Sequence, residues 1–159
     1  MKEENMTEEI YPMPSFPTLI VSDLAGSSNF YQNALSFKHI FTMPGPGGQP
    51  ALVHLRWAKY ADLLIASPRD NKELSVPKGV GVSLNFNIFD HFGGDIDAFA
   101  KHARENGANV IGPIEQPWNV REVTVLDPDG YRLVFTVPLN VNMKFDEVIE
   151  RASSDNPTK

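Results

Sequence analysis

The most informative part of this chain is Gln116-Pro117-Trp118-Asn119-Val120-Arg121-Glu122-Val123-Thr124-Val125-Leu126-Asp127-Pro128-Asp129-Gly130-Tyr131-Arg132-Leu133-Val134-Phe135. Side chains alternate between two sets before and after Asp127-Pro128-Asp129-Gly130, which is the period of a strand. Pro128 fixes φ and Gly130 can take φ > 0, so these four residues suit a tight reversal. The stretch therefore predicts two antiparallel strands, at about 120–126 and 131–137.

The same order of elements is predicted twice along the chain. The first half has strand patterns at 17–22, 37–43, 51–57 and 61–66, with a helix pattern at 25–35 after the first strand. The second half has strand patterns at 82–88, 109–114, 120–126 and 131–137, with a helix pattern at 95–106 that stops at Asn106-Gly107. Because the order repeats, the pattern indicates two βαβββ modules.

Two further motifs lie near the start of the chain, Val21-Ser22-Asp23-Leu24 and Asn29-Phe30-Tyr31. Together with the Asp-Pro-Asp-Gly turn they resemble the vicinal oxygen chelate superfamily of glyoxalases, bleomycin resistance proteins and extradiol dioxygenases. The resemblance covers about residues 16–138 and implies an α+β fold, in which modules 14–68 and 79–138 form a cupped mixed β-sheet with the ligand in the cup. It also implies a homodimer, with the groove completed across a two-fold axis.

Members of this superfamily typically hold a divalent metal ion through His and carboxylate side chains at fixed places. In this sequence the places that match those ligands are occupied by Phe16, Leu64, Ser83 and Val134. Three of these side chains have no lone pair to offer, and a divalent ion needs several N, O or S donors at close range. We therefore expect no metal ion and no other cofactor.

The alternation of strand side chains also predicts which residues face a ligand. Asn85 shares a face with Ser83, His54 with Arg56, Glu122 with Thr124, and Arg132 with Val134. The predicted ligand-binding residues are therefore polar groups and two indole rings that can add apolar area: His54, Trp57, Asn85, Trp118, Glu122 and Arg132. Simpler roles also explain them, since either Trp can belong to a core or an interface, and Glu122 can pair with Arg121, Arg132 or Arg56.

Composition narrows the class of protein further. The 159 residues carry a net charge of −6, no cysteine and no cluster of Lys or Arg, so we expect no nucleic-acid partner. No stretch is apolar for long enough to span a bilayer, which predicts a cytoplasmic protein without a membrane partner. The polar ends predict a disordered extension at 1–13 and a short helix with a tail at 139–159.

Three functional classes are consistent with these patterns. The first is a metal-free protein that binds a small organic molecule, similar to the bleomycin resistance proteins that sequester an antibiotic. The second is a lyase, isomerase or dioxygenase of the same superfamily that uses non-standard residues such as His54, Asp62 and Glu122. The third is a regulatory or interaction module whose cup is vestigial. Fold alone does not separate these classes, and we favour the first.

Overall fold

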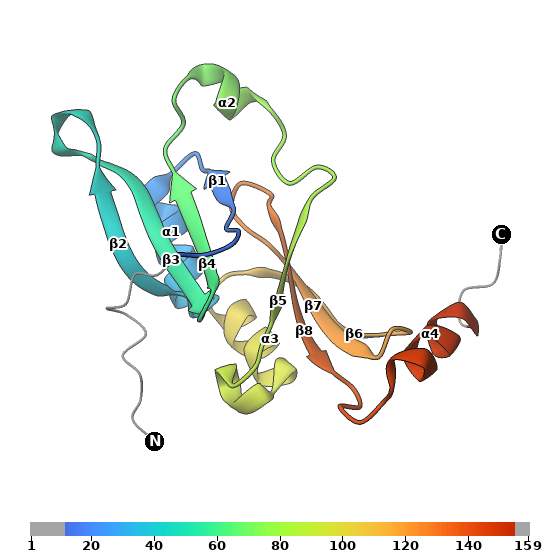
Figure 1. The fold of residues 1–159 in the computed structure, drawn as a ribbon. Coiled ribbons are helices and arrows are strands. Elements are labelled where there is room, and N and C mark those ends of the chain that lie inside the picture. The colour runs from blue at the N-terminus through green and yellow to red at the C-terminus, as the bar shows by residue number, and fades with distance from the viewer. Residues whose placement is uncertain (1–11, 155–159) are drawn as a thin grey trace. The chain divides into compact units, whose positions relative to one another are not determined.

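Each half of the chain forms a four-stranded mixed sheet with a helix packed on one side, in a computed structural model that describes residues 12–154 (Figure 1). The residues fall into two units. The first unit runs to Val80 and also includes Asp127–Tyr131, whereas the second contains Gly81–Leu126 and the chain from Arg132 onward. The predicted α+β fold with two βαβββ repeats is confirmed.

The first unit has the strand order β1-β4-β3-β2, in which β1 runs parallel to β4 and the other pairs are antiparallel. Its elements are β1 Thr18–Ile20, α1 Leu24–Asn33, β2 Lys38–Pro44, the 3-10 helix η1 Pro46–Gly48, β3 Pro50–Ala58, β4 Ala61–Ala66 and α2 Asn71–Ser75. Asp23 begins α1 because its side chain accepts a hydrogen bond from the Gly26 amide at 3.0 Å.

The second unit repeats this topology with the order β5-β8-β7-β6, and β5 runs parallel to β8. Its elements are β5 Ser83–Asn87, the 3-10 helix η2 His91–Gly94, α3 Ile96–Glu105, β6 Asn109–Gln116, β7 Val120–Leu126, β8 Arg132–Pro138 and α4 Phe145–Ser154. Asp95 caps α3 through the amides of Asp97 and Ala98. Gly107, at φ 87°, follows the end of α3, as predicted.

Each unit buries the helix-facing side of its sheet. In the first unit α1 packs on β3 and β4, and the largest buried side chains include Tyr31 and Trp57. In the second unit α3 packs on β6, β7 and β8 around Phe99 and Phe135. The opposite face of each sheet carries more polar and exposed side chains. We call these two surfaces the open face of the first sheet and the open face of the second sheet.

Three segments differ from the prediction. The segment between the two predicted modules contains α2, which Asp70 caps through the amides of Lys72 and Glu73. Helix α4 reaches Ser154, so the first part of the tail is helical. The Asp127–Tyr131 turn belongs to the first unit, although the repeat placed it in the second module. The predicted disorder at 1–13 lies outside the described residues except for its last two positions.

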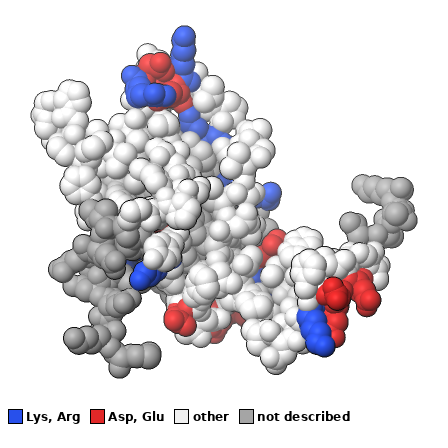
Figure 2. Space-filling view, viewed as in Figure 1, with Lys and Arg blue, Asp and Glu red and all other residues white. Residues whose placement is uncertain are grey.

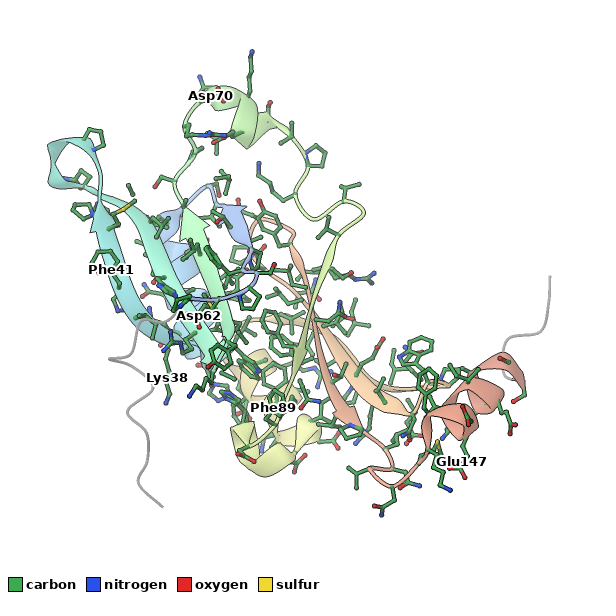
Figure 3. The ribbon with its side chains drawn as sticks, viewed as in Figure 1. Lys38, Phe41, Asp62, Asp70, Phe89 and Glu147 are labelled. Atoms are coloured by element: carbon green, nitrogen blue, oxygen red, sulfur yellow. The ribbon has the colours of Figure 1, made fainter. Side chains whose placement is uncertain are left out.

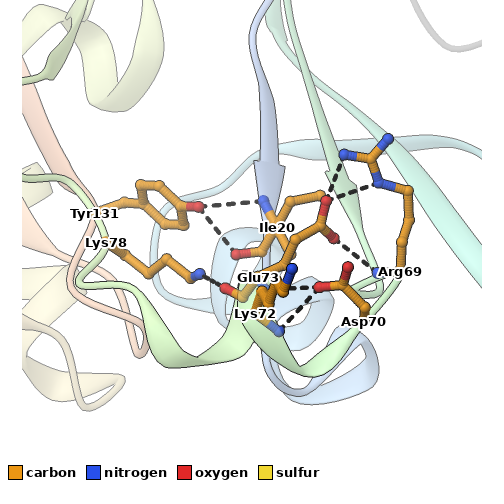
Figure 4. A network of polar contacts seen from close by, with 7 residues as sticks. All are labelled: Ile20, Arg69, Asp70, Lys72, Glu73, Lys78 and Tyr131. Atoms are coloured by element: carbon orange, nitrogen blue, oxygen red, sulfur yellow. Dashed lines mark hydrogen bonds and ion pairs between the residues drawn. The ribbon is translucent and has the colours of Figure 1, made fainter.

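The Asp127–Tyr131 turn is held in the first unit by hydrogen bonds far apart in sequence. The buried Tyr31 hydroxyl donates to Asp127 Oδ2 at 2.9 Å. The Tyr131 hydroxyl accepts from the Ile20 amide at 3.2 Å and donates to the Ile20 carbonyl at 3.0 Å (Figure 4). Asp129 Oδ1 accepts from the Ser22 amide at 3.0 Å. These bonds fix the turn against the end of β1 and against α1.

Burial raises the pKa of the Asp127 carboxyl above its usual range. The folded chain therefore holds the Asp127 proton to a higher pH than the unfolded chain, and this stabilising contribution is lost as pH rises through the folded pKa. We expect the stability of the wild type, relative to Asp127→Asn, to increase as pH falls from 7 to 4. Urea titrations across that range measure the difference.

Glu73→Gln is a control for the Asp127 experiment, because its stability difference from the wild type should change with pH in the opposite direction. Hydrogen bonds from Arg69 lower the pKa of the Glu73 carboxyl, so its contribution is present at neutral pH and is lost as pH falls. The wild type should therefore lose stability relative to Glu73→Gln over the same range. A difference between wild type and Asp127→Asn that stays constant, or that shrinks in acid, would contradict the Asp127 assignment.

Candidate ligand-binding site

Strand register defines the open face of the first sheet. His54 on β3 lies opposite Leu64 on β4 and opposite Phe41 on β2, and Arg56 lies opposite Asp62 and Lys38. Paired residues point to the same side of a sheet, so these side chains share one face, together with Thr18, Ile20, Met43, Leu52 and Ala66. The predicted grouping of His54 with Arg56 is confirmed, because the bulge in β3 lies after Arg56.

A buried ion pair lies at the centre of this face. The Arg56 guanidinium donates from Nε to Asp62 Oδ1 at 2.7 Å and from Nη2 to Asp62 Oδ2 at 2.8 Å. Both residues are almost completely buried, at 1% and 3% exposure. Asp62 Oδ2 also lies 2.6 Å from Nε2 of His54. The Asp62 carboxylate is thus hydrogen-bonded to both Arg56 and His54, and both contacts fix its orientation.

His54 is the polar group of this cluster that reaches the surface. Its side chain is 15% exposed, and its second ring nitrogen, Nδ1, has no hydrogen-bond partner within residues 12–154. Its cross-strand neighbour Phe41 is 48% exposed, and Met43, further along β2, is 44% exposed. Figure 3 labels Phe41 on β2 and Asp62 on β4. An unpaired ring nitrogen beside exposed apolar side chains can bind an organic molecule.

Charged side chains gather elsewhere on the visible surface of the molecule. Figure 2 shows Lys, Arg, Asp and Glu over α2 and over α4. On the open face of the first sheet, Lys38 is exposed and has no ion pair within the described residues. Arg56 and Asp62 cancel each other's charge. This face therefore does not share the negative balance of the whole chain, which is −6.

The open face of the second sheet carries the other predicted polar residues. Register places Asn85 opposite Val134, Ser83 opposite Arg132, and Thr124 opposite Val134. The predicted grouping of these residues on one face is confirmed. Asn85 and Arg132 are exposed, and the Arg132 side chain makes no hydrogen bond or ion pair within the described residues. Both are therefore accessible to a ligand in this structure.

The prediction that Trp57 contacts a ligand needs correction. Trp57 is completely buried and lies 5.2 Å from Phe37 between ring centroids, so it belongs to the core and offers no area to a ligand. Its position on β3 points it to the helix side, opposite to His54. Glu122 accepts a hydrogen bond from Gln116 Nε2 at 2.6 Å, and Arg121 pairs with Asp97 instead. Trp118, in contrast, is 49% exposed in the turn between β6 and β7.

The residues at the superfamily's metal positions do not fit a divalent ion. In the first unit Phe16, which precedes β1, is 46% exposed, and Leu64 on β4 lies opposite His54 on β3. Neither side chain has a donor atom. On the second sheet Val134 is a hydrocarbon, and Ser83 offers one weak donor. Within residues 12–154 there is no group of three His, Cys, Asp or Glu side chains placed to hold a metal ion.

The first unit contains a small cavity that the strand and helix patterns do not predict. Its volume is about 240 Å³, and it is lined by Ile20, Glu73, Val76, Pro77, Lys78, Gly79, Val80 and Tyr131. The polar groups around it already have partners: Glu73 accepts from Arg69, Lys78 donates to the Glu73 carbonyl, and Tyr131 bonds Ile20 (Figure 4). Since the strand pattern ends before this connector, no periodic signal predicted the cavity.

The chain belongs to the Glyoxalase/Bleomycin resistance protein/Dioxygenase superfamily, whose family model matches residues 15–135. An uncharacterized protein of Mycobacterium bovis is 28% identical over 145 residues, which cover 87% of this chain and 91% of the relative. TnmS3, an antibiotic binding protein from Streptomyces sp. CB03234, aligns with a TM-score of 0.59 and 23% identity, covering 81% of this chain and 97% of TnmS3.

A third comparison agrees with this assignment at the level of the fold. A family enzyme from Burkholderia phytofirmans aligns with a TM-score of 0.62 and 20% identity, over 79% of this chain and 98% of that structure. Solved structures of this fold therefore include one described as an antibiotic binding protein and one described as an enzyme. The site residues, rather than the fold, must separate the two functions. None of the helices within residues 12–154 is long and apolar enough to cross a membrane.

Proposed function

We propose that this protein binds a small organic molecule on the open face of the first sheet and does so without a metal ion. The observation that carries the proposal is the exposure of Phe41 and Met43 beside the unpaired Nδ1 of His54. Such a surface combines apolar contact area with one oriented polar group, which is the usual composition of a small-molecule site. An antibiotic is one such molecule, and the fold similarity to TnmS3 supports that choice.

The same contacts argue against acid–base catalysis by Asp62. Its carboxylate is already hydrogen-bonded to Arg56 and His54 and is buried, so it has no free oxygen directed at a substrate.

Asn85, Trp118, Glu122 and Arg132 on the second unit stay predicted ligand contacts. The homodimer also stays a prediction, which light scattering at micromolar concentration tests.

Replacing Phe41 by Ser should weaken ligand binding at least about tenfold, since burying a Phe side chain contributes roughly 1.5–3 kcal/mol. The ligand is first identified by native mass spectrometry of protein purified from its own host, and calorimetry then measures its affinity. Leu74→Ser is the matched control, because Leu74 is 44% exposed and lies on α2 rather than on a strand of the sheet. Equal affinities for wild type and Phe41→Ser would contradict the proposed face.

Metal removal should leave ligand affinity unchanged. Phe16, Leu64 and Val134 offer no donor atoms, so dialysed protein should contain no stoichiometric transition metal by elemental analysis. Affinity should be the same before and after treatment with a chelator. One tightly held metal ion per chain, with binding lost on chelation and restored by the metal, would contradict the metal-free proposal.

A further inference from the structure

The hydrogen bonds around Asp62 determine which nitrogen of His54 carries the proton. Arg56 donates one hydrogen bond to each carboxylate oxygen of Asp62, so both oxygens act as acceptors. An ionised carboxylate can only accept hydrogen bonds. Since Nε2 of His54 lies 2.6 Å from Asp62 Oδ2, Nε2 must be the donor. In the neutral imidazole, Nδ1 therefore has a lone pair and acts as an acceptor.

The surroundings of Nδ1 are apolar on both neighbouring strands. Phe41 on β2 and Leu64 on β4 are the cross-strand neighbours of His54. Neither side chain can donate a hydrogen bond, and Nδ1 has no partner within the described residues. A ligand that covers this face without a donor group would remove water from Nδ1 and leave the acceptor unpaired, at a cost in affinity. A ligand with a donor at that place would restore the hydrogen bond.

Charge on the same face selects further among ligands. Among the face residues of β1 to β4, Asp62 is the single acid, and Arg56 cancels its charge. Lys38 adds one positive charge at the edge strand. A cationic ligand would meet no unpaired carboxylate on this sheet, although the whole chain is acidic. A neutral or weakly acidic ligand is compatible with this arrangement.

We propose that the ligand of this face is an aromatic compound with a hydroxyl group, which donates a hydrogen bond to Nδ1 of His54 while its ring packs on Phe41. This inference rests on the proposed function, because it specifies the ligand class of the same site. It predicts selectivity for a free hydroxyl over its methyl ether, since the ether keeps the apolar area and loses the donor.

The test uses 2-naphthol and 2-methoxynaphthalene as matched probes. Fluorescence titration should show 2-naphthol binding about tenfold more tightly, which is the effect of one hydrogen bond to a partly buried group. His54→Phe keeps an aromatic ring and removes Nδ1, so the two probes should bind that variant with the same affinity. His54→Gln, which can donate to Asp62 and present its carbonyl oxygen, should restore part of the preference.

Each outcome of the titration has a separate meaning. Equal binding of both probes to the wild type, or a preference that persists in His54→Phe, overturns the hydroxyl proposal and leaves the proposed function standing. Binding of neither probe counts against the aromatic site itself and so overturns both. Nitrogen-15 NMR of the wild-type histidine rings tests which ring nitrogen of His54 carries the proton, without a binding measurement on any variant. A His54 that carries a proton on Nδ1, whether the ring is neutral or charged, would overturn the inference.

Discussion

Asp62→Ala should lower the free energy of unfolding by about 3–5 kcal/mol, because it removes the buried carboxylate that pairs with the Arg56 guanidinium. Arg56 is 1% exposed and Asp62 is 3% exposed, so the carboxylate is lost from a site that bulk water does not reach in the intact protein. The substitution also removes the acceptor for Nε2 of His54. Urea unfolding followed by circular dichroism measures the loss, and the hydroxyl preference of the site should disappear with it.

The double variant Arg56→Met with Asp62→Leu separates the cost of an unpaired charge from the value of the pair. Replacing both partners by apolar residues of similar volume is often neutral or stabilising, so this variant should be much more stable than Asp62→Ala. Arg69→Ala is the control for an exposed ion pair, and it should change stability little. If the double variant were as unstable as Asp62→Ala, packing rather than charge would explain the loss.

Phe135→Ala should destabilise the second unit by about 3–5 kcal/mol, the usual cost of deleting a buried phenyl ring and leaving a cavity. Phe135 on β8 is completely buried, and its ring centroid lies 4.5 Å from that of Phe99 on α3 and 5.4 Å from that of Phe86 on β5. These rings join the helix to its sheet. The measurement is chemical unfolding, with Trp118 fluorescence as a probe placed in the same unit.

The neighbouring position on β8 supplies a control for the Phe135 experiment. Thr136 points to the opposite face, and within residues 12–154 its hydroxyl makes one hydrogen bond, a long one of 3.4 Å to the Phe86 carbonyl. Thr136→Ala should therefore cost less than about 1 kcal/mol. Phe135→Leu should lie between the two, since Leu fills part of the cavity. A loss from Phe135→Ala no larger than that from Thr136→Ala would contradict the assignment of Phe135 to the core.

The sequence does not show which of the two tryptophans is buried and which is exposed. Both Trp57 and Trp118 are near strand ends, and composition does not distinguish a buried indole from an exposed one. The structure places Trp57 against Phe37 in the core and leaves Trp118 in an exposed turn. The alternation of side chains along β3 places Trp57 and His54 on opposite faces of the sheet. Which of these faces is buried depends on where α1 packs. That packing is a tertiary contact.

Local patterns alone determined the order of elements, the faces of the strands and the residues at the metal positions. The strands Ala61–Ala66 and Val120–Leu126 have the predicted bounds, because alternation with period two and turn residues are local properties of the chain. The replacement of donors by Phe16, Leu64 and Val134 is likewise visible in the sequence, since it depends only on side-chain chemistry.

Tertiary structure alone decided which polar side chains bond to one another. Asp62 pairs with Arg56 and His54 across β3 and β4, and Asp127 accepts from Tyr31 over 96 positions of the chain. Several acids and bases of equal chemistry compete for such pairings, and strand register and burial select among them. The free nitrogen of His54, on which the proposed ligand class depends, follows from that selection and has no signal in the sequence.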